Sequence, residues 1–416
     1  MTSGSVVRLG LLVGGGRVPE EIAEAAVARG WPVHVVGIDG EVDGTFPGLP
    51  VTRVNWGQIG RMTRAFRENG CTHLVIVGRV SRPDMTKLKP DFGLVQAIPS
   101  ILRIMASGGD DGVLRGVVRF FEGHGLTVLG PADVAPELAI GAGAIGTRAP
   151  SAEDEIDIAK GLSIVRLLGA FDVGQSVVVR GGAIIAIEGA EGTDRMLSRV
   201  APTESGARGV LVKRPKPQQD MRVDMPVIGP DTISNSARAG LAGVAVLAGQ
   251  VLITQRQEVV ARAEQEGLFV AGVTDGQAVS GHAAPRGKDK ASGDNEDIAR
   301  GAAILRVLQP FVASRSVVVA RKYVLAIESG EGVEAVLRRV GGLRQWGSQH
   351  TKKRSGFAVL GEGQRIEASH VDLAVAAGLR GLAAAGPDSV SAQAKERAGA
   401  TGLALAAADV ATRSRS

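Results

Sequence analysis

The chain has 416 residues, a formal net charge of +5, 58 glycines, one cysteine and 3% aromatic residues. This length predicts two or three domains, and a single cysteine excludes a framework of disulfides. The scarcity of aromatic side chains argues against a protein that stacks nucleic-acid bases. The basic surplus suits an anionic small molecule or an anionic membrane surface at least as well as nucleic acid.

The first predicted elements form a strand, glycine turn, helix and strand, the arrangement found in each half of a dinucleotide-binding domain. Strands expected at 8–13 and 32–38 flank a helix at 19–29. The first strand ends in Gly14, Gly15 and Gly16, and backbone amides exposed at such a turn favour phosphate. A tight turn that lets strand meet helix explains the glycines equally well. A nicotinamide cofactor is disfavoured because Pro19 replaces the third glycine of the dinucleotide fingerprint.

Two further positions in the N-terminal domain are candidates for binding an anion or a metal. A strand at 73–77 leads to Arg79, and ligands of parallel sheets sit at the carboxyl ends of strands, although a surface ion pair is an equal alternative. A helical stretch is expected at 95–107. Asp110 and Asp111 then precede a helix expected at 113–124, where they would ligate a metal or cap the helix.

A second domain begins after an expected linker at 141–148. Its first helix, 151–168, is capped by Ser151 with Asp154 three residues on, and a Gly-Gly hairpin joins strands 176–180 and 183–188. Gln175 precedes this hairpin. Thr193 and Asp194 open a short helix at 194–200, where they would bind phosphate or Mg²⁺–phosphate, or act as an ordinary helix cap.

The stretch that follows carries the densest charge. An apolar strand at 210–212 leads into Lys213 and Lys216 among prolines, and then into Asp220 and Asp224 with an arginine between them. Lysines neutralise phosphate oxygens and a carboxylate holds Mg²⁺ or a water molecule, which predicts a phosphate-handling site. A solvated charged loop is the alternative.

After a polar linker expected at 274–296, the chain repeats its second domain. Residues 161–200 align without a gap to residues 301–340, and about 17 of these 40 positions are identical. The polar candidates differ: Gln175, Thr193 and Asp194 correspond to Arg315, Val333 and Glu334, and the 213–224 loop has no counterpart. The first copy is therefore expected to carry the site and the second to be a scaffold.

Residues 8–275 resemble the LpxI family of UDP-2,3-diacylglucosamine pyrophosphatases, the class in lipid A biosynthesis that is not a calcineurin-like metallophosphoesterase. The motifs that carry the resemblance occur in family order: LGLLVGGG at 9–16, GRVSRP at 78–83, GDDG at 109–112, DVGQ at 172–175, EGTD at 191–194, KRPKP at 213–217, RVDMP at 222–226 and AGLAG at 239–243.

The resemblance implies a Rossmann-like N-terminal domain, a distinct α/β C-terminal domain with the ligand between them, and Mg²⁺-dependent hydrolysis that releases UMP and 2,3-diacylglucosamine 1-phosphate. The family's key acid falls on Asp224. The residues and the resemblance together predict Asp224, Asp220 and Lys213 as catalytic and Asp224 with Asp194 as metal ligands. The expected substrate-binding residues are Gly14, Gly15, Gly16, Arg79, Asp110, Asp111, Gln175, Thr193, Asp194 and Lys216.

The expected architecture is an α/β protein with domains at 1–147, 150–275 and 288–416, the last a degenerate copy of the second. No signal peptide is expected, so the predicted location is cytoplasmic, with peripheral contact at the inner membrane left open. The expected partner is a UDP-sugar lipid and not nucleic acid, and the expected state is a monomer or a homodimer. The extra copy would supply within one chain a contact otherwise made between subunits. A non-catalytic nucleotide-sugar binder derived from the enzyme is the alternative function.

Overall fold

The computed structural model describes residues 7–81, 89–95, 97–98, 110–203, 206, 208–275, 293–311, 316–343 and 353–410. The chain divides into two compact units. Unit 1 contains Met1–Gly141, Gln218–Pro230 and Ala248–Val259, and unit 2 contains Ala142–Pro217, Asp231–Leu247 and Val260–Ser416. The chain therefore returns to unit 1 after leaving it, and the stretch between Lys213 and Asp224 passes from one unit to the other.

Unit 1 contains a parallel sheet with strand order β3-β2-β1-β4-β5. The order reverses between β1 and β4, which is the Rossmann-like arrangement that the sequence predicts. The strands are β1 (Leu9–Val13), β2 (Val33–Ile38), β3 (Val51–Val54), β4 (His73–Val77) and β5 (Thr127–Leu129), and the helices are α1 (Val18–Ala28), α2 (Ile59–Glu68), α4 (Asp110–Glu122) and α5 (Pro131–Val134).

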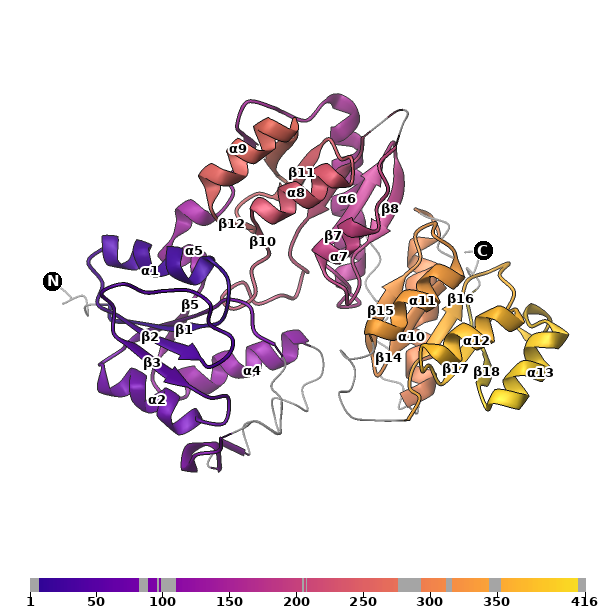
Figure 1. Ribbon diagram of the computed structural model, residues 1–416, viewed down its shortest axis with the longest axis horizontal. Helices are drawn as coiled ribbons and strands as arrows, with labels where there is room; N and C mark the ends of the chain where they lie inside the picture. The colour runs from indigo at the N-terminus through magenta and orange to yellow at the C-terminus, as the bar shows by residue number, and fades with distance from the viewer. Residues whose placement is uncertain are drawn as a thin grey trace, which may run out of the picture. The chain divides into compact units, whose positions relative to one another are not determined.

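Helices cover both faces of this sheet, with α1 and α5 on one face and α2 and α4 on the other (Figure 1). Alternate residues of one strand supply the two cores: Leu11 packs with Ile22 of α1, and Leu12 packs in the cluster that holds Phe66 of α2. Strands β1 and β2 are buried along their whole length, so they are nearly continuous apolar runs, and that is why the sequence showed them clearly.

The first copy of the repeated domain is built on a mixed sheet with order β6-β13-β11-β9-β7-β8. Strands β9, β11 and β13 are parallel, while β6, β7 and β8 run antiparallel to their neighbours. Its elements are β6 (Gly143–Ile145), α6 (Ala152–Gly169), β7 (Ser176–Arg180), β8 (Ala183–Ile187), α7 (Thr193–Ser198), β9 (Val210–Lys213), α8 (Pro230–Arg238), β11 (Gly243–Leu247), α9 (Arg256–Glu266) and β13 (Phe269–Val273). Between them, β10 (Val227–Ile228) and β12 (Leu252–Ile253) form a small parallel pair in unit 1.

The second copy repeats this topology. Its sheet has the order β15-β14-β16-β17-β18, which matches β8-β7-β9-β11-β13 strand for strand. The elements are α10 (Gly293–Leu308), β14 (Ser316–Ala320), β15 (Tyr323–Ile327), α11 (Val333–Leu343), β16 (Phe357–Leu360), α12 (Ala368–Ala376), β17 (Gly381–Ala384), α13 (Ala392–Thr401) and β18 (Ala404–Ala407). The predicted α/β class with a tandem C-terminal domain is confirmed.

Several local expectations can be compared directly with the structure. The capping box of α6 is present, because Ser151 Oγ accepts from Asp154 N (3.2 Å) and Asp154 Oδ2 accepts from Ser151 N (2.9 Å). The prediction of a linker at 141–148 was wrong in part, because this stretch contains the edge strand β6. The linker expected at 274–296 overlaps α10, and its residues 276–292 lie outside the described residues, as does most of the helix expected at 95–107. None of the described helices is long and apolar enough to cross a membrane.

Candidate active site

The strand order of unit 1 reverses between β1 and β4, and there the glycine turn after β1 meets the residues that follow β4. Gly15 N donates to Arg79 O and Arg79 N donates to Gly15 O, both at 2.8 Å. Ligands of open α/β sheets bind where the strand order reverses. The structure therefore brings together Gly14, Gly15, Gly16 and Arg79 at the edge of the sheet where the sequence placed an anion site.

Packing explains much of the glycine requirement. A Cβ on Gly14 would lie 2.2 Å from Arg79 O, and Gly16 has φ +99°. The amide of Gly16 already donates to Asp43 Oδ1 at 2.8 Å. The Arg79 side chain is exposed and has no carboxylate partner among the described residues. The tight-turn interpretation thus accounts for Gly14, while Arg79 keeps a guanidinium available to an anion. The side chains of Asp110 and Asp111 lie outside what the structure describes.

A polar cluster lies in the first C-terminal copy, at the end of β9. Lys213, 8% exposed, donates from Nζ to Thr193 Oγ1 at 3.1 Å. Thr193 in turn donates to Glu188 Oε2 at 3.1 Å, and its oxygen lies 3.1 Å from Ser176 Oγ. Gln175 joins through its backbone, whose N–H donates to Glu188 Oε2 at 3.3 Å. A buried ammonium is thus held by a hydroxyl that a carboxylate orients.

The second copy lacks this cluster. Strand register pairs Ser176 with Lys213 in the first copy and Ser316 with Leu360 in the second, so Leu360 occupies the lysine position. Val333 replaces the threonine. Ser316 Oγ is left buried without a hydrogen bond among the described residues. The second copy therefore keeps the serine but has a valine in place of the threonine that the serine of the first copy contacts.

The second lysine is held by a loop of the same copy. Lys216 Nζ forms a close ion pair with Asp172, whose backbone has the left-handed φ of +55°. Gly174 beside it has φ +40°, and a Cβ there would lie 2.3 Å from Glu188 O. A non-glycine residue in the left-handed region costs free energy, so the surrounding contacts must hold it. The loop that fixes Lys216 therefore packs directly on the residue that fixes Thr193.

Asp194 lies on the first turn of α7, away from these hydrogen bonds. Its Oδ1 accepts from Asn235 Nδ2 at 2.8 Å, and Asn235 belongs to α8. Among the described contacts, Asp194 and Lys213 share no hydrogen bond, although Asp194 follows Thr193 in sequence and Lys213 binds it.

The aspartates of the charged stretch belong to unit 1. Asp220 accepts from Arg222 Nε (2.9 Å) and Nη2 (2.8 Å), and Arg222 also contacts Glu122 at 2.9 Å. The Arg222 hydrogen bonds hold the pKa of Asp220 below its usual range despite partial burial. Asp220 is therefore an ionised partner of an arginine. Asp224 is partly exposed, and its N–H donates to Asp220 O at 3.0 Å while its own carbonyl accepts from Gln219 Nε2 at 2.6 Å.

The predicted site residues thus fall into two groups. Lys213, Lys216, Thr193 and Asp194 are in unit 2, whereas Asp220 and Asp224 are in unit 1 with the glycine turn. Across the described parts of both units, no three His, Cys, Asp or Glu side chains gather as metal ligands. Mg²⁺ commonly takes one or two carboxylates and completes its shell with water and substrate phosphates.

Sequence reasoning missed Glu188, Ser176 and Asn235. Glu188 and Ser176 recur in the second copy as Glu328 and Ser316, so a search for differences between the copies assigns them to the scaffold. Asn235 has no distinctive local motif, and only the packing of α8 reveals its contact with Asp194.

These features define the class: an α/β protein with a Rossmann-like N-terminal domain and two tandem C-terminal domains, the first of which carries the Lys213–Thr193–Glu188 cluster. The LpxI N-terminal domain model matches residues 8–138, and the LpxI C-terminal domain model matches twice, at residues 141–271 and 282–410. The chain belongs to the LpxI family, as the motifs indicated.

A curated relative, the UDP-2,3-diacylglucosamine pyrophosphatase LpxI of Caulobacter vibrioides, is 40% identical over 273 residues. The match covers 97% of the relative but 64% of this chain. The rest of the chain is therefore additional to a nearly complete match.

Proposed function

We propose that the chain hydrolyses the diphosphate of UDP-2,3-diacylglucosamine to UMP and 2,3-diacylglucosamine 1-phosphate in lipid A biosynthesis. The observation that carries this proposal is the 40% identity over 97% of a relative named as that pyrophosphatase. The intact Lys213–Thr193–Glu188 cluster of the first copy, and its loss from the second, support the first copy as the working one.

The reaction requires water to add to one phosphorus while the bridging P–O bond breaks. The products are two phosphate monoesters, and the proton of the attacking water leaves to a base. Negative charge accumulates on phosphate oxygens, so Lys213 and Lys216 stabilise the transition state electrostatically. Asp224 orients the water or accepts its proton. Asp220, as the ionised partner of Arg222, fixes the turn that carries Asp224.

Mg²⁺ belongs to this proposal, with Asp224 and Asp194 as the side chains that would hold it. When bound, the ion neutralises charge on the diphosphate oxygens. The protein would supply one or two carboxylate ligands. Thr193 holds Lys213 in place and Asp172 holds Lys216.

The test is UMP release from UDP-2,3-diacylglucosamine, with Mg²⁺ and then with chelator, for the parent protein and Asp224→Ala. We expect metal-dependent release that falls by about 10²–10³ in the variant, the loss typical of removing one group that acts in the transition state. Glu24→Ala, at an exposed carboxylate of α1 in the same unit, is the matched control. Tight binding of the nucleotide sugar without UMP from folded parent protein would favour the non-catalytic binder.

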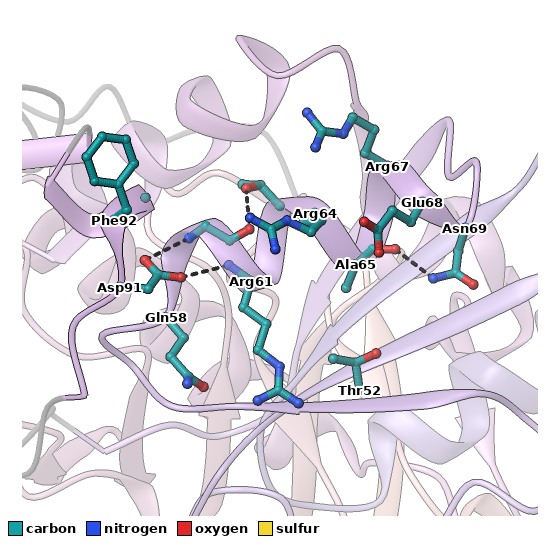
Figure 2. Close-up of a pocket in the computed structure, with 13 residues that line it drawn as sticks. Thr52, Gln58, Arg61, Arg64, Ala65, Arg67, Glu68, Asn69, Asp91 and Phe92 are labelled. Carbon is teal, nitrogen blue, oxygen red and sulfur yellow. Dashed lines mark hydrogen bonds between the residues drawn. The ribbon is translucent and has the colours of Figure 1, made fainter.

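We propose in addition that the chain is cytoplasmic and that unit 1 contacts an anionic lipid surface. Arg61, Arg64 and Arg67 on α2 are exposed and line a hollow of about 600 Å³ with Phe92 (Figure 2). None of these guanidinium groups has a carboxylate partner among the residues described. Phe92 is 75% exposed and Val95 56%. Cations beside exposed apolar side chains complement anionic headgroups and the acyl region beneath them.

Asp91 ties the apolar residues to the basic helix. Its carboxylate accepts from Gly60 N (3.1 Å), Arg61 N (2.8 Å) and Leu94 N (2.8 Å), so it holds the start of α2 against the start of the 92–95 helical segment. Burial opposes ionisation, but these backbone donors hold the pKa of Asp91 below its ordinary value. The arginines and Phe92 are therefore presented as one surface.

Sedimentation with vesicles tests this surface. We expect binding to vesicles that contain phosphatidylglycerol and not to pure phosphatidylcholine. Each cation near an anionic surface contributes about 1 kcal/mol, so Arg64→Ala with Arg67→Ala should weaken binding by about 10–30-fold. Arg365→Ala, an exposed arginine of unit 2, should bind like the parent. Equal binding of the parent to both vesicle types would refute the proposal.

A further inference from the structure

The two C-terminal copies contact each other with the reciprocity of a twofold pair. Glu191 and Arg199 of the first copy correspond to Glu331 and Arg339 of the second, each pair 140 residues apart. Arg199 contacts Glu191 at 3.2 Å and Glu331 at 3.5 Å. Arg339 pairs closely with Glu331, and its Nε lies 3.9 Å from Glu191 Oε2. Each arginine is therefore within ion-pair distance of both glutamates, as in an isologous interface.

Each arginine also binds the equivalent carbonyl of its own copy. Arg199 Nη2 donates to Ile187 O at 2.7 Å, and Arg339 Nη2 donates to Ile327 O at 3.0 Å. The pKa of Glu331 is lowered, because the charge of Arg339 and hydrogen bonds outweigh the opposing effect of burial. Glu331 is thus held ionised inside the contact.

Backbone and apolar contacts accompany the ion pairs. Ala190 N donates to Leu325 O at 3.1 Å, and Ser329 Oγ donates to Ile185 O at 3.1 Å, where residues 185 and 325 are equivalent. A Cβ on Gly189 would lie 2.5 Å from Leu325 O. One cluster of buried side chains includes Val165 of α6 and Leu305 of α10, so it runs through both copies. The contact is therefore extensive and partly apolar.

The contact first reaches the candidate site through Glu191. The turn that contains Glu191 lies between Glu188, which orients Thr193, and Thr193 itself, which binds Lys213. A side chain from the second copy, Arg339, thus contacts the turn that places the buried lysine.

A second point of coupling does not follow the twofold relation. Arg300 on α10 of the second copy donates to Phe171 O, next to Asp172, the partner of Lys216. Burial lowers the pKa of Arg300, and the charge of Asp172 acts in the opposite direction. The equivalent residue, Lys160, instead binds Gly182 O inside its own copy. Because of this asymmetry, a guanidinium group of the second copy contacts the backbone of the first copy.

We propose that the second C-terminal copy is a built-in partner that positions the site of the first copy, Arg339 through the 188–193 turn and Arg300 through the 171–175 loop. This inference rests on the proposed function for its kinetic test. Neither arginine touches the substrate, so both are positioning residues. Their loss should loosen Thr193 and Lys216 without removing a reacting group.

The test compares Arg300→Ala, Arg300→Lys and Arg339→Ala in the full chain. We expect each alanine variant to lower kcat for UMP release by about tenfold with little change in KM, because a small misplacement of a charged group weakens transition-state stabilisation. Arg300→Lys should recover most of the loss, since a lysine still supplies a cation and a donor. Arg338→Ala is the control, because Arg338 is 61% exposed and pairs with Glu334 of its own helix.

Hydrogen exchange separates a failure of this inference from a failure of the proposed function. Arg300→Ala should speed amide exchange in residues 171–175, and Arg339→Ala in residues 188–193, with or without turnover. Parent protein that releases no UMP but shows these changes would overturn the proposed function and keep the coupling. Exchange at both segments as slow as in the Arg338→Ala control would overturn the coupling, as would kinetics equal to that control.

Discussion

Replacing Lys213 by leucine tests the site assignment with a substitution that the protein itself contains, because Leu360 occupies the equivalent position of the second copy and is 0% exposed there. The change removes a hydrogen bond from a charged donor to Thr193 Oγ1. Such bonds contribute about 1.5–3 kcal/mol. In the second copy, leucine is accommodated at the end of the equivalent strand, β16.

The stability cost should be small for two physical reasons. Thr193 keeps Glu188 and Ser176 as partners, so no buried hydroxyl is orphaned. Removing a buried charge also relieves its desolvation, and apolar replacements of buried ionic groups are often neutral. We expect a net change within about 1 kcal/mol, which corresponds to a shift in Tm of about 2–4 °C for a domain of this size.

The activity cost should be large, because a cation that stabilises transition-state charge in a buried site is worth about 10²–10³ in rate. The assay is kcat/KM for UMP release beside a thermal melt of the same preparation. Lys395→Leu, at an exposed lysine of the second copy, is the matched control. An unchanged kcat/KM would refute the assignment of Lys213, and a fall in Tm far beyond 4 °C would show that its role is structural.

Three further outcomes follow from single contacts. Gly14→Ala should destabilise unit 1 by about 2 kcal/mol or more in a denaturant titration, because its Cβ would clash with Arg79 O at 2.2 Å and the backbone must shift. Val333→Thr should raise Tm of the second copy, since the new hydroxyl gives Ser316 Oγ the partner that it lacks, for about 0.5–1.5 kcal/mol. Folding lowers the pKa of Glu331, so its contribution to the free energy of unfolding is complete above the unfolded pKa of about 4.3 and is lost as pH falls through the folded pKa. Glu331→Gln should therefore flatten the dependence of the free energy of unfolding on pH in this acid range.

The predictability of the fold depended on how each element buries its side chains. Strand β4 was predicted at its observed bounds, because both of its faces carry apolar side chains. Strand β3 has two exposed positions among Val51–Val54 and β6 is rich in small residues, so neither presents an apolar run. Both are edge strands, which are recognised by their pairing and not by their composition.

The site was predictable where the two copies differ and not where they agree. Thr193 was found because its counterpart is Val333, and Lys213 because the charged stretch that it opens has no counterpart in the second copy. Glu188 was missed because its counterpart is also glutamate. The charged stretch was treated as one loop, yet the chain passes from unit 2 to unit 1 between Pro217 and Gln218. Such a crossing depends on tertiary contacts of residues far apart in sequence, and local spacing carries no sign of it.

The residues in which the two copies agree and differ also support the proposed role of the second copy. Val333 and Leu360 have lost the polar groups of the site, and Ser316 is left with a buried hydroxyl that makes no hydrogen bond among the described residues. An orphaned buried group costs about 1–3 kcal/mol, so the second copy tolerates a loss of stability at the former site. Glu331 and Arg339, by contrast, keep the identity of their counterparts and form the reciprocal contact. A retained pairing surface beside an apolar former site is what the proposed positioning role predicts, and the positioning experiment tests it.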